Sequence, residues 1–121
     1  MADLCYMELN LMQIFDVLRS ADFVRLALCG GDGAYVAPMA FQLEVRGGTA
    51  VVHMASPARG RKIDMLRRCA QVCIEAELPG CGWLDTVLLE GRAVIGAEEA
   101  GGVRVSVPAE HLTGRRYFLP G

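Results

Sequence analysis

The feature that most constrains the fold of this chain is a strict alternation of apolar and polar side chains in several short segments. In residues 34–45 one face is wholly apolar, and Gln42 and Glu44 take the other face at the far end; the apolar face consists of Tyr35, Ala37, Met39, Phe41, Leu43 and Val45. Residues 71–78 and 103–107 repeat this alternation. A period of two indicates β-strands that place one face on a hydrophobic core.

Six such strands at fairly even spacing predict a mainly β domain. The expected strands cover residues 23–29, 34–45, 49–55, 71–78, 83–95 and 103–107. Even spacing with clean alternation favours a small closed barrel, because closure removes the sheet edges. The length of 121 residues predicts one domain over residues 1–121, without internal repeats.

Two short helices are expected beside these strands. The first has apolar residues at helical spacing, namely Leu11, Ile14, Phe15 and Leu18. Asn10 and Gln13 are placed to form a capping box at its start. The second helix follows a break at Ser56-Pro57 and has Ile63, Met65 and Leu66 as its apolar positions.

Proline and glycine mark irregular places in the strands. Pro38 cannot donate to a ladder, so its strand is expected to be an edge, bulged, or unpaired near the proline, which would offer backbone groups to a ligand. Gly91 marks a bulge or a close approach. Residues 30–33 (GGDG) lack the spacing of a dinucleotide-binding loop, and a hairpin turn is expected there.

The charge and hydropathy of the chain exclude several classes of protein. A net charge of −2 argues against a general nucleic-acid binder. No apolar run approaches the roughly 18 residues of a membrane helix, and no basic region followed by an apolar run marks a secretory signal. We therefore expect a cytoplasmic protein with neither nucleic acid nor membrane as partner.

The cysteines point to the same compartment. There are five, no CxxC motif occurs, and no histidine lies at metal-ligand spacing from them. This pattern predicts reduced, mostly buried thiols and no metal site, and it disfavours a redox role for Cys69 and Cys73.

Basic residues concentrate around the second expected helix. Residues 59–68 contain five of the twelve basic residues of the chain and one acid, Asp64. A strand end, a turn with Gly60 and cations at a helix start make a plausible phosphate site, because the first N–H groups of a helix are unpaired and its dipole favours an anion. The alternative is a solvated basic helix on the surface.

Five motifs resemble those of one family. Residues 35–41 are similar to a strand of form YVVPxxF, and residues 53–55 with 60–66 to an HxA…GRKxxxL signature followed by a strand like residues 71–73. Residues 83–92 resemble a strand ending in EGR, and residues 111–115 a closing HxTGK. In this order they resemble the pyridoxamine 5′-phosphate oxidase-like split barrels that bind flavin mononucleotide (FMN), specifically the nitroimidazole-resistance-like branch.

The resemblance implies a six-stranded antiparallel split β-barrel with two short helices, FMN as cofactor, and a homodimer with flavin sites at its interface. The family's phosphate-binding arginine and lysine map onto Arg61 and Lys62. The backbone of Met39, Ala40 and Phe41 would line the flavin ring, and His53, Met54, Ala55 and Ser56 would flank its pyrimidine edge. Thr86 occupies the position of a polar residue that reaches the flavin from the second subunit.

The chain departs from the family pattern in three places. Two extra residues between Ala55 and Gly60 lengthen the phosphate turn. Residues 96–102 are too short for the family's helix before the last strand, which affects the substrate side most. Arg115 replaces the lysine of the tail motif.

Several of these residues also have ordinary structural explanations. His53, the one catalytic candidate, could donate a proton near bound substrate or could be a strand-end histidine. Ser56 could only cap the following turn, and Trp83 and His111 are expected to be structural. With two histidines in the chain and neither matching the role, no Ser-His-Asp set is expected.

The expected activity is reduction or oxidation of a small molecule by bound flavin, with a nitro-aromatic, a quinone or a pyridoxal vitamer as substrate. The alternatives are a non-catalytic flavin or haem carrier or sensor dimer, and a structural dimer that has lost its ligand.

Overall fold

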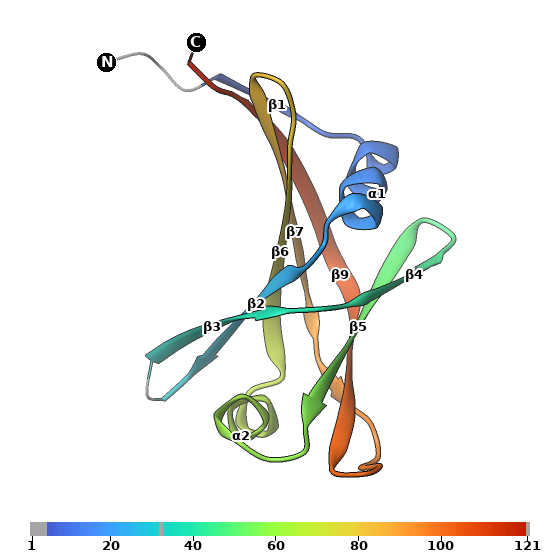
Figure 1. Cartoon of the computed structure of the whole chain (residues 1–121), viewed down its shortest axis with the longest axis vertical. Coiled ribbons are helices and arrows are strands. Elements are labelled where there is room, and N and C mark those ends of the chain that lie inside the picture. Colours follow the sequence, from blue (N-terminus) through green and yellow to red (C-terminus); the bar gives the residue numbers. More distant parts are fainter. Residues whose placement is uncertain (1–4, 32, 121) are drawn as a thin grey trace.

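The computed structural model describes residues 5–31 and 33–120, which form nine strands and two helices (Figure 1). The first half of the chain contains β1 (Cys5–Glu8), α1 (Leu11–Ser20), β2 (Val24–Gly30), β3 (Gly33–Met39), β4 (Gln42–Arg46) and β5 (Thr49–Pro57). The second half contains α2 (Arg61–Arg68), β6 (Gln71–Pro79), β7 (Trp83–Arg92), β8 (Val94–Ile95) and β9 (Gly102–Phe118).

The strands form one antiparallel path in the order β3-β2-β6-β7-β9-β5-β4, and β1 and β8 pair additionally with β9. Within the described residues the path is open, because β3 and β4 end it without pairing to each other. The closed barrel expected from strand spacing is therefore wrong, whereas the split barrel with two helices is confirmed. In Figure 1 the β3–β4 segment crosses in front of the other strands.

The prediction of six strands undercounts the nine in the described part of the chain. Two expected strands each divide, one between β3 and β4 and the other between β7 and β8, and β1 was not predicted. The last strand also continues beyond its expected end at Val107. Its proline, Pro108, is tolerated because it lies where β9 leaves β5 and begins to pair with β7.

Both helices form where the apolar spacing predicts them. Asn10 accepts a hydrogen bond from the Gln13 N–H at 2.9 Å, and the Asn10 N–H donates to the Gln13 side chain at 2.9 Å, so the capping box is confirmed. The α1 helix buries Ile14, Phe15, Val17 and Leu18, and α2 buries Ile63, Met65 and Leu66. No helix in the described residues is long and apolar enough to cross a membrane.

The core lies between the two halves of the sheet and the helices. Its largest fully buried side chains are Leu18, Leu26, Ile63, Ile74 and Leu89. Each contributes about 1.5–3 kcal/mol relative to an exposed position. The alternate positions of the strands point outward and form a second, more polar face, which is called the outer face below and includes His53, Leu88 and Ser106.

The irregular positions behave as their residue types predict. β3 is an edge strand, which accounts for Pro38. The register of β7 and β9 shifts between Glu90 and Gly91, and a Cβ on Gly91 would lie 2.2 Å from the Pro108 carbonyl oxygen, so Gly91 marks both a bulge and a close approach. Gly30 and Gly33 pair across the expected β2–β3 hairpin turn, of which Asp32 lies outside the described residues.

The cysteines differ from the prediction, because they are not mostly buried. Cys5, Cys29, Cys69 and Cys81 are exposed and Cys73 is half-buried. Cys29 and Cys73 alternate with buried neighbours and so fall on the outer face, whereas Cys69 ends α2 and Cys81 lies in the loop before β7. Burial raises the pKa of the Cys73 thiol, with Glu90 and Glu75 adding to the shift.

Candidate functional site

A hollow of about 860 Å³ lies between the β3–β4 connection, β5 and the start of β9. Six of the ten predicted cofactor-binding residues line it, namely Ala40, Phe41, His53, Met54, Ala55 and Ser56. Gln42, Glu99 and Arg104 also line it and add polar groups to a mainly apolar wall. Its volume is in the usual range for small-molecule and cofactor sites.

The wall at Ala40 and Phe41 exists because the sheet is interrupted there. Met39 pairs with Val24 and Gln42 pairs with His53, but in the described part of the chain neither Ala40 nor Phe41 has a strand partner. Their backbone N–H and C=O groups are therefore not used in a ladder beside the hollow. The predicted unpaired segment is present, two residues after Pro38.

His53 holds two hydrogen bonds across the outer face. Its Nε2 lies 2.8 Å from Glu44 Oε1 and its Nδ1 lies 2.8 Å from Ser106 Oγ. The hydrogen bond from His53, followed by that from Arg46, holds the pKa of the Glu44 carboxyl below its ordinary value of 4.5. Both ring nitrogens are thus engaged within the chain, so direct contact with a ligand requires one of these bonds to open.

The sequence analysis expects no Ser-His-Asp set, and it did not foresee the hydrogen-bonded line of Glu44, His53 and Ser106 that the structure contains. The three residues come from β4, β5 and β9, so their proximity depends on strand register. Ser106 is directly opposite His53 in the β5–β9 pair. Glu44 is two positions from Gln42, which is opposite His53 in the β4–β5 pair.

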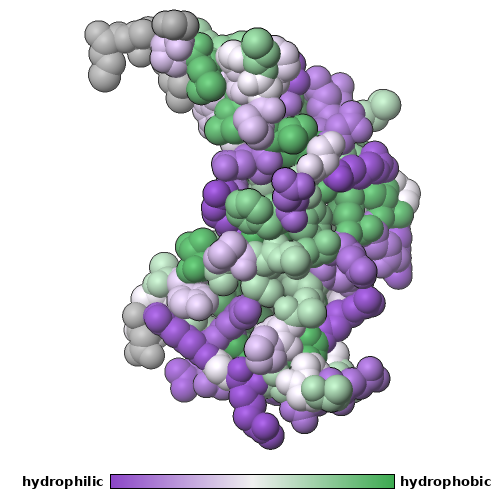
Figure 2. Space-filling view, in the orientation of Figure 1, coloured by the Kyte–Doolittle hydropathy of each residue, from purple (hydrophilic) through white to green (hydrophobic). Residues whose placement is uncertain are grey.

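Arg61 and Lys62 lie outside this hollow, at the start of α2 shortly after β5. The Lys62 ammonium donates to Met39 Sδ at 3.2 Å, and the Arg61 guanidinium lies 4.7 Å from the centre of the Tyr35 ring. Met39 itself is buried. Figure 2 shows hydrophilic side chains gathered at the lower end of the molecule, where α2 lies in Figure 1.

Ser56 and Thr86 already make local hydrogen bonds. The buried Ser56 hydroxyl donates to the Pro57 carbonyl at 2.9 Å, in agreement with a turn-stabilising role. The Thr86 hydroxyl donates to the Arg115 carbonyl at 3.4 Å on the outer face of β7. Thr86 does not line the hollow of its own chain.

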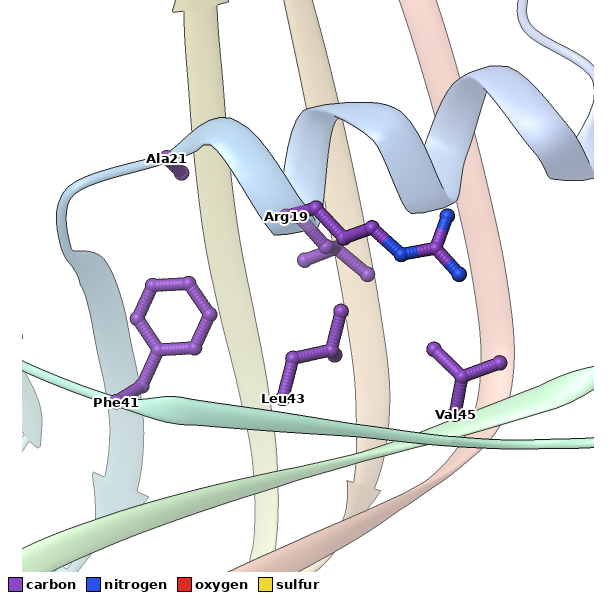
Figure 3. A pocket seen from close by; sticks show the side chains of 6 residues that line it. Arg19, Ala21, Phe41, Leu43 and Val45 are labelled. Atoms are coloured by element: carbon purple, nitrogen blue, oxygen red, sulfur yellow. The ribbon is translucent and has the colours of Figure 1, made fainter.

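A second hollow of about 440 Å³ lies between α1 and β4 (Figure 3). Phe41, Leu43 and Val45 point toward the helix, and the Arg19 side chain extends along it above them. Phe41 lines both hollows and so forms part of the wall between them.

Sequence reasoning missed four polar residues of the region: Gln42, Glu99, Arg104 and Ser106. The strand alternation does place Gln42, Arg104 and Ser106 on the outer face, but it does not reveal which strands are neighbours. Glu99 lies in the turn before β9, where it pairs with Gly102. Within residues 5–31 and 33–120 no three metal-ligating side chains come together.

Solved structures with closely similar folds are known, although no protein-family model and no curated protein sequence matches the chain. A candidate 5-nitroimidazole antibiotic resistance protein from Bacteroides thetaiotaomicron has a TM-score of 0.84 at 17% identity, over 96% of this chain and 90% of that one. A FAD-binding protein from Mesorhizobium loti has a TM-score of 0.82 at 19% identity, over 95% and 98%.

A candidate pyridoxamine 5′-phosphate oxidase from Corynebacterium glutamicum matches over 100% of this chain and 98% of that one, with a TM-score of 0.76 at 16% identity. The chain has the split-barrel fold of the pyridoxamine 5′-phosphate oxidase-like proteins. At these identities the split-barrel likeness describes the fold alone.

The Glu44 contact leads to a prediction about acid stability. Because the pKa of the Glu44 carboxyl is lowered in the folded state, the ionised carboxylate stabilises the fold at pH values above 4.5, its ordinary pKa. This contribution is lost as the pH falls below 4.5 through the lowered pKa. Thermal melts at pH 7 to 3 should therefore show a shallower acid loss for Glu44→Gln than for the wild type. The exposed Glu98→Gln variant should retain the wild-type slope, and parallel curves for Glu44→Gln and wild type would contradict this.

Proposed function

We propose that this protein binds FMN in the 860 Å³ hollow and uses it to reduce or oxidise a small molecule. The observation that carries the proposal is the meeting of six predicted ring-contacting residues on one hollow, beside an unpaired stretch of backbone. A flavin ring needs an apolar slot with a few fixed donors, which describes this wall. Two of the similar solved structures, from Mesorhizobium loti and Mycobacterium smegmatis, are described as FAD-binding proteins.

The phosphate of FMN would be held by the first turn of α2. Arg61 is exposed and Lys62 half-buried, and the N-cap, Gly60, has φ of 124° and no side-chain cap. The first N–H groups of a helix have no intrahelical partner, and the helix dipole favours an anion there. An arginine fork and a lysine point charge complement a phosphate dianion.

The proposed assembly is a homodimer that covers the outer face. Val36, Leu88 and Val94 expose 57%, 44% and 57% of their surface on that face, which a second subunit would bury. A hollow that is open on one side gains its second wall in this way. Thr86 of the second subunit would then contribute to the flavin site.

When bound, flavin supplies two-electron redox chemistry, and the protein supplies orientation, electrostatics and exclusion of water. The turn before β9 contains no helix in the structure, which leaves this side of the hollow uncovered by such an element. We infer a broad specificity for small nitro-aromatics, quinones or vitamers. The second candidate function is a flavin or haem carrier or sensor without turnover, and a cytoplasmic location is part of both.

One set of measurements separates these functions. Purified protein that binds flavin should absorb at ~370 and ~450 nm, whereas haem gives one intense band at ~400 nm. Flavin released by denaturation can be identified as FMN or FAD by chromatography. With reduced nicotinamide as donor, stopped-flow reoxidation should show reduction of at least one nitro-aromatic, quinone or vitamer. Reoxidation by oxygen alone would favour the carrier or sensor.

Removal of the two cations should weaken FMN binding specifically. We expect Arg61→Ala/Lys62→Ala to lower FMN affinity at least tenfold, about 1.4 kcal/mol, in a fluorescence-quenching titration. Riboflavin, which lacks the phosphate, should bind the variant and the wild type equally. The matched control Arg67→Ala/Arg68→Ala removes the same charge from the last turn of α2 and should leave FMN affinity unchanged. Wild-type FMN affinity in the first variant would refute the phosphate assignment.

The dimer should depend on the outer face. Light scattering should give twice the chain mass of 13.1 kDa for the wild type, and Leu88→Glu should shift the protein to monomer because it places a charge in the proposed interface. Met12→Glu is the matched control, because Met12 is 77% exposed on α1. A wild-type monomer that binds flavin fully would overturn the shared site.

A further inference from the structure

Among the described residues that line the 860 Å³ hollow, Arg104 in β9 is the one lysine or arginine. In the described part of the chain its side chain has no hydrogen bond, ion pair or ring contact. By contrast, His53 and Ser56, which also line the hollow, are already engaged in hydrogen bonds within the chain. Arg104 is therefore the cation of this wall that remains available to a ligand.

The neighbours of Arg104 on the outer face are all small. Ala55 lies directly opposite on β5, and Gly96, whose N–H donates to the Arg104 carbonyl at 2.8 Å, lies on the other side of β9. Along β9 the residues two positions away are Gly102 and Ser106. None of these four positions carries a long side chain that could cover the guanidinium. Three of them, Ala55, Gly96 and Gly102, line the hollow themselves.

An unpaired guanidinium at the wall of a cavity is suited to a carboxylate. Its N–H groups form a planar fork that can donate to both carboxylate oxygens at once, and such charge-assisted bonds are stronger than those between neutral groups. The apolar part of the wall, which includes Phe41 and Met54, is suited to an aromatic ring. The hollow therefore has the groups needed to bind a ring that carries an acidic substituent.

Glu99 limits the charge that such a ligand can carry. Its backbone is fixed in the turn before β9, where its N–H donates to the Gly102 carbonyl at 2.8 Å and its carbonyl accepts from the Gly102 N–H at 2.9 Å. Glu99 and Arg104 both belong to the described residues, and no ion pair joins their side chains. The second negative charge of a phosphate ester would be repelled by the Glu99 carboxylate, and the described wall offers no second arginine or lysine to offset it.

We propose that Arg104 binds the carboxylate of an anionic substrate and that Glu99 restricts this subsite to monoanions. The proposal rests on the proposed function and deepens it, because it states the charge of the substrates that the hollow prefers. Arg104 is in this role a specificity-determining residue, which contacts a substituent of the substrate and takes no part in electron transfer.

The first test measures binding to the oxidised, flavin-loaded protein, in which no electrons are available for turnover. 4-Nitrobenzoate and 4-nitrobenzamide have nearly the same shape and differ in charge, and each can be titrated through the change in flavin absorption. The wild type should bind the acid at least tenfold more tightly than the amide, about 1.4 kcal/mol. Arg104→Ala should abolish this difference by weakening the binding of the acid alone.

Matched variants test the fork and the charges separately. Arg104→Lys keeps the charge and loses the fork, so it should retain part of the preference for the acid. Arg92→Ala removes the same charge at the exposed end of β7, outside the hollow, and should match the wild type. Glu99→Gln should bind 4-nitrophenyl phosphate more tightly than the wild type does, whereas Glu98→Gln, at an exposed position that does not line the hollow, should not.

Four results would overturn parts of the assignment. If Arg104→Ala lowers FMN affinity, Arg104 is a ligand of the cofactor. If the same variant changes the mass measured by light scattering from dimer to monomer, Arg104 belongs to the subunit interface. Equal affinity of the wild type for the acid and the amide would refute the carboxylate subsite. Unchanged affinity of Glu99→Gln for the phosphate ester would refute the charge limit.

The outcomes also separate this proposal from the reductase. If the wild type reduces the acid and the amide and binds both equally, the carboxylate subsite is wrong and the reductase stands. If the wild type binds the acid through Arg104 and reduces no member of the panel above, the subsite stands and the reductase is wrong. If the purified protein binds no flavin, both proposals are wrong.

Discussion

The backbone pairing of β9 is the constraint on which the rest of this structure depends. Its first part pairs with β5 and its second part with β7, so one strand joins both halves of the open sheet path. The hollow, the Glu44–His53–Ser106 array and the outer face all take their geometry from that pairing. Each of them combines segments that are distant in sequence, so a change in the register of β9 would disperse all three.

The local features of the fold could be predicted from single segments because their causes are local. A capping box needs only Asn10 and Gln13, and alternation along one strand identifies its buried side. The divided strands could not be foreseen in this way. Whether Ala40 and Phe41 pair depends on which strands lie beside them, and the alternation of the segment continues through the break without a signal. The prediction of buried cysteines was wrong because it relied on residue type alone. Cys29 and Cys73 alternate with buried residues in their strands, and their side chains therefore lie on the outer face.

The candidate site likewise combines residues that the sequence indicates with contacts that depend on which strands are neighbours. Motif positions indicated His53 and the residues after it, and the structure brings six of the predicted residues to one hollow. The partners of His53 were not foreseen, because Ser106 is 53 residues away in sequence and meets it only through cross-strand register. Arg61 and Lys62, which the motifs place beside these residues, lie beyond the end of β5 and do not line the hollow, whose charged residues are instead Glu99 and Arg104.

The bulge at Gly91 has a consequence for the two ends of β9. Before it, the odd-numbered residues Val103, Val105 and Val107 are buried and Arg104 and Ser106 face outward. After it, Gly114 faces inward opposite Val87, and the odd-numbered Thr113 and Arg115 face outward. The extra residue in β9 thus changes which positions face inward, from odd-numbered before the bulge to even-numbered after it. One strand can therefore direct apolar side chains into the core along both of its halves. Because a side chain at Gly91 would collide with the Pro108 carbonyl, glycine at this position permits the bulge after which the other set of β9 side chains faces the core.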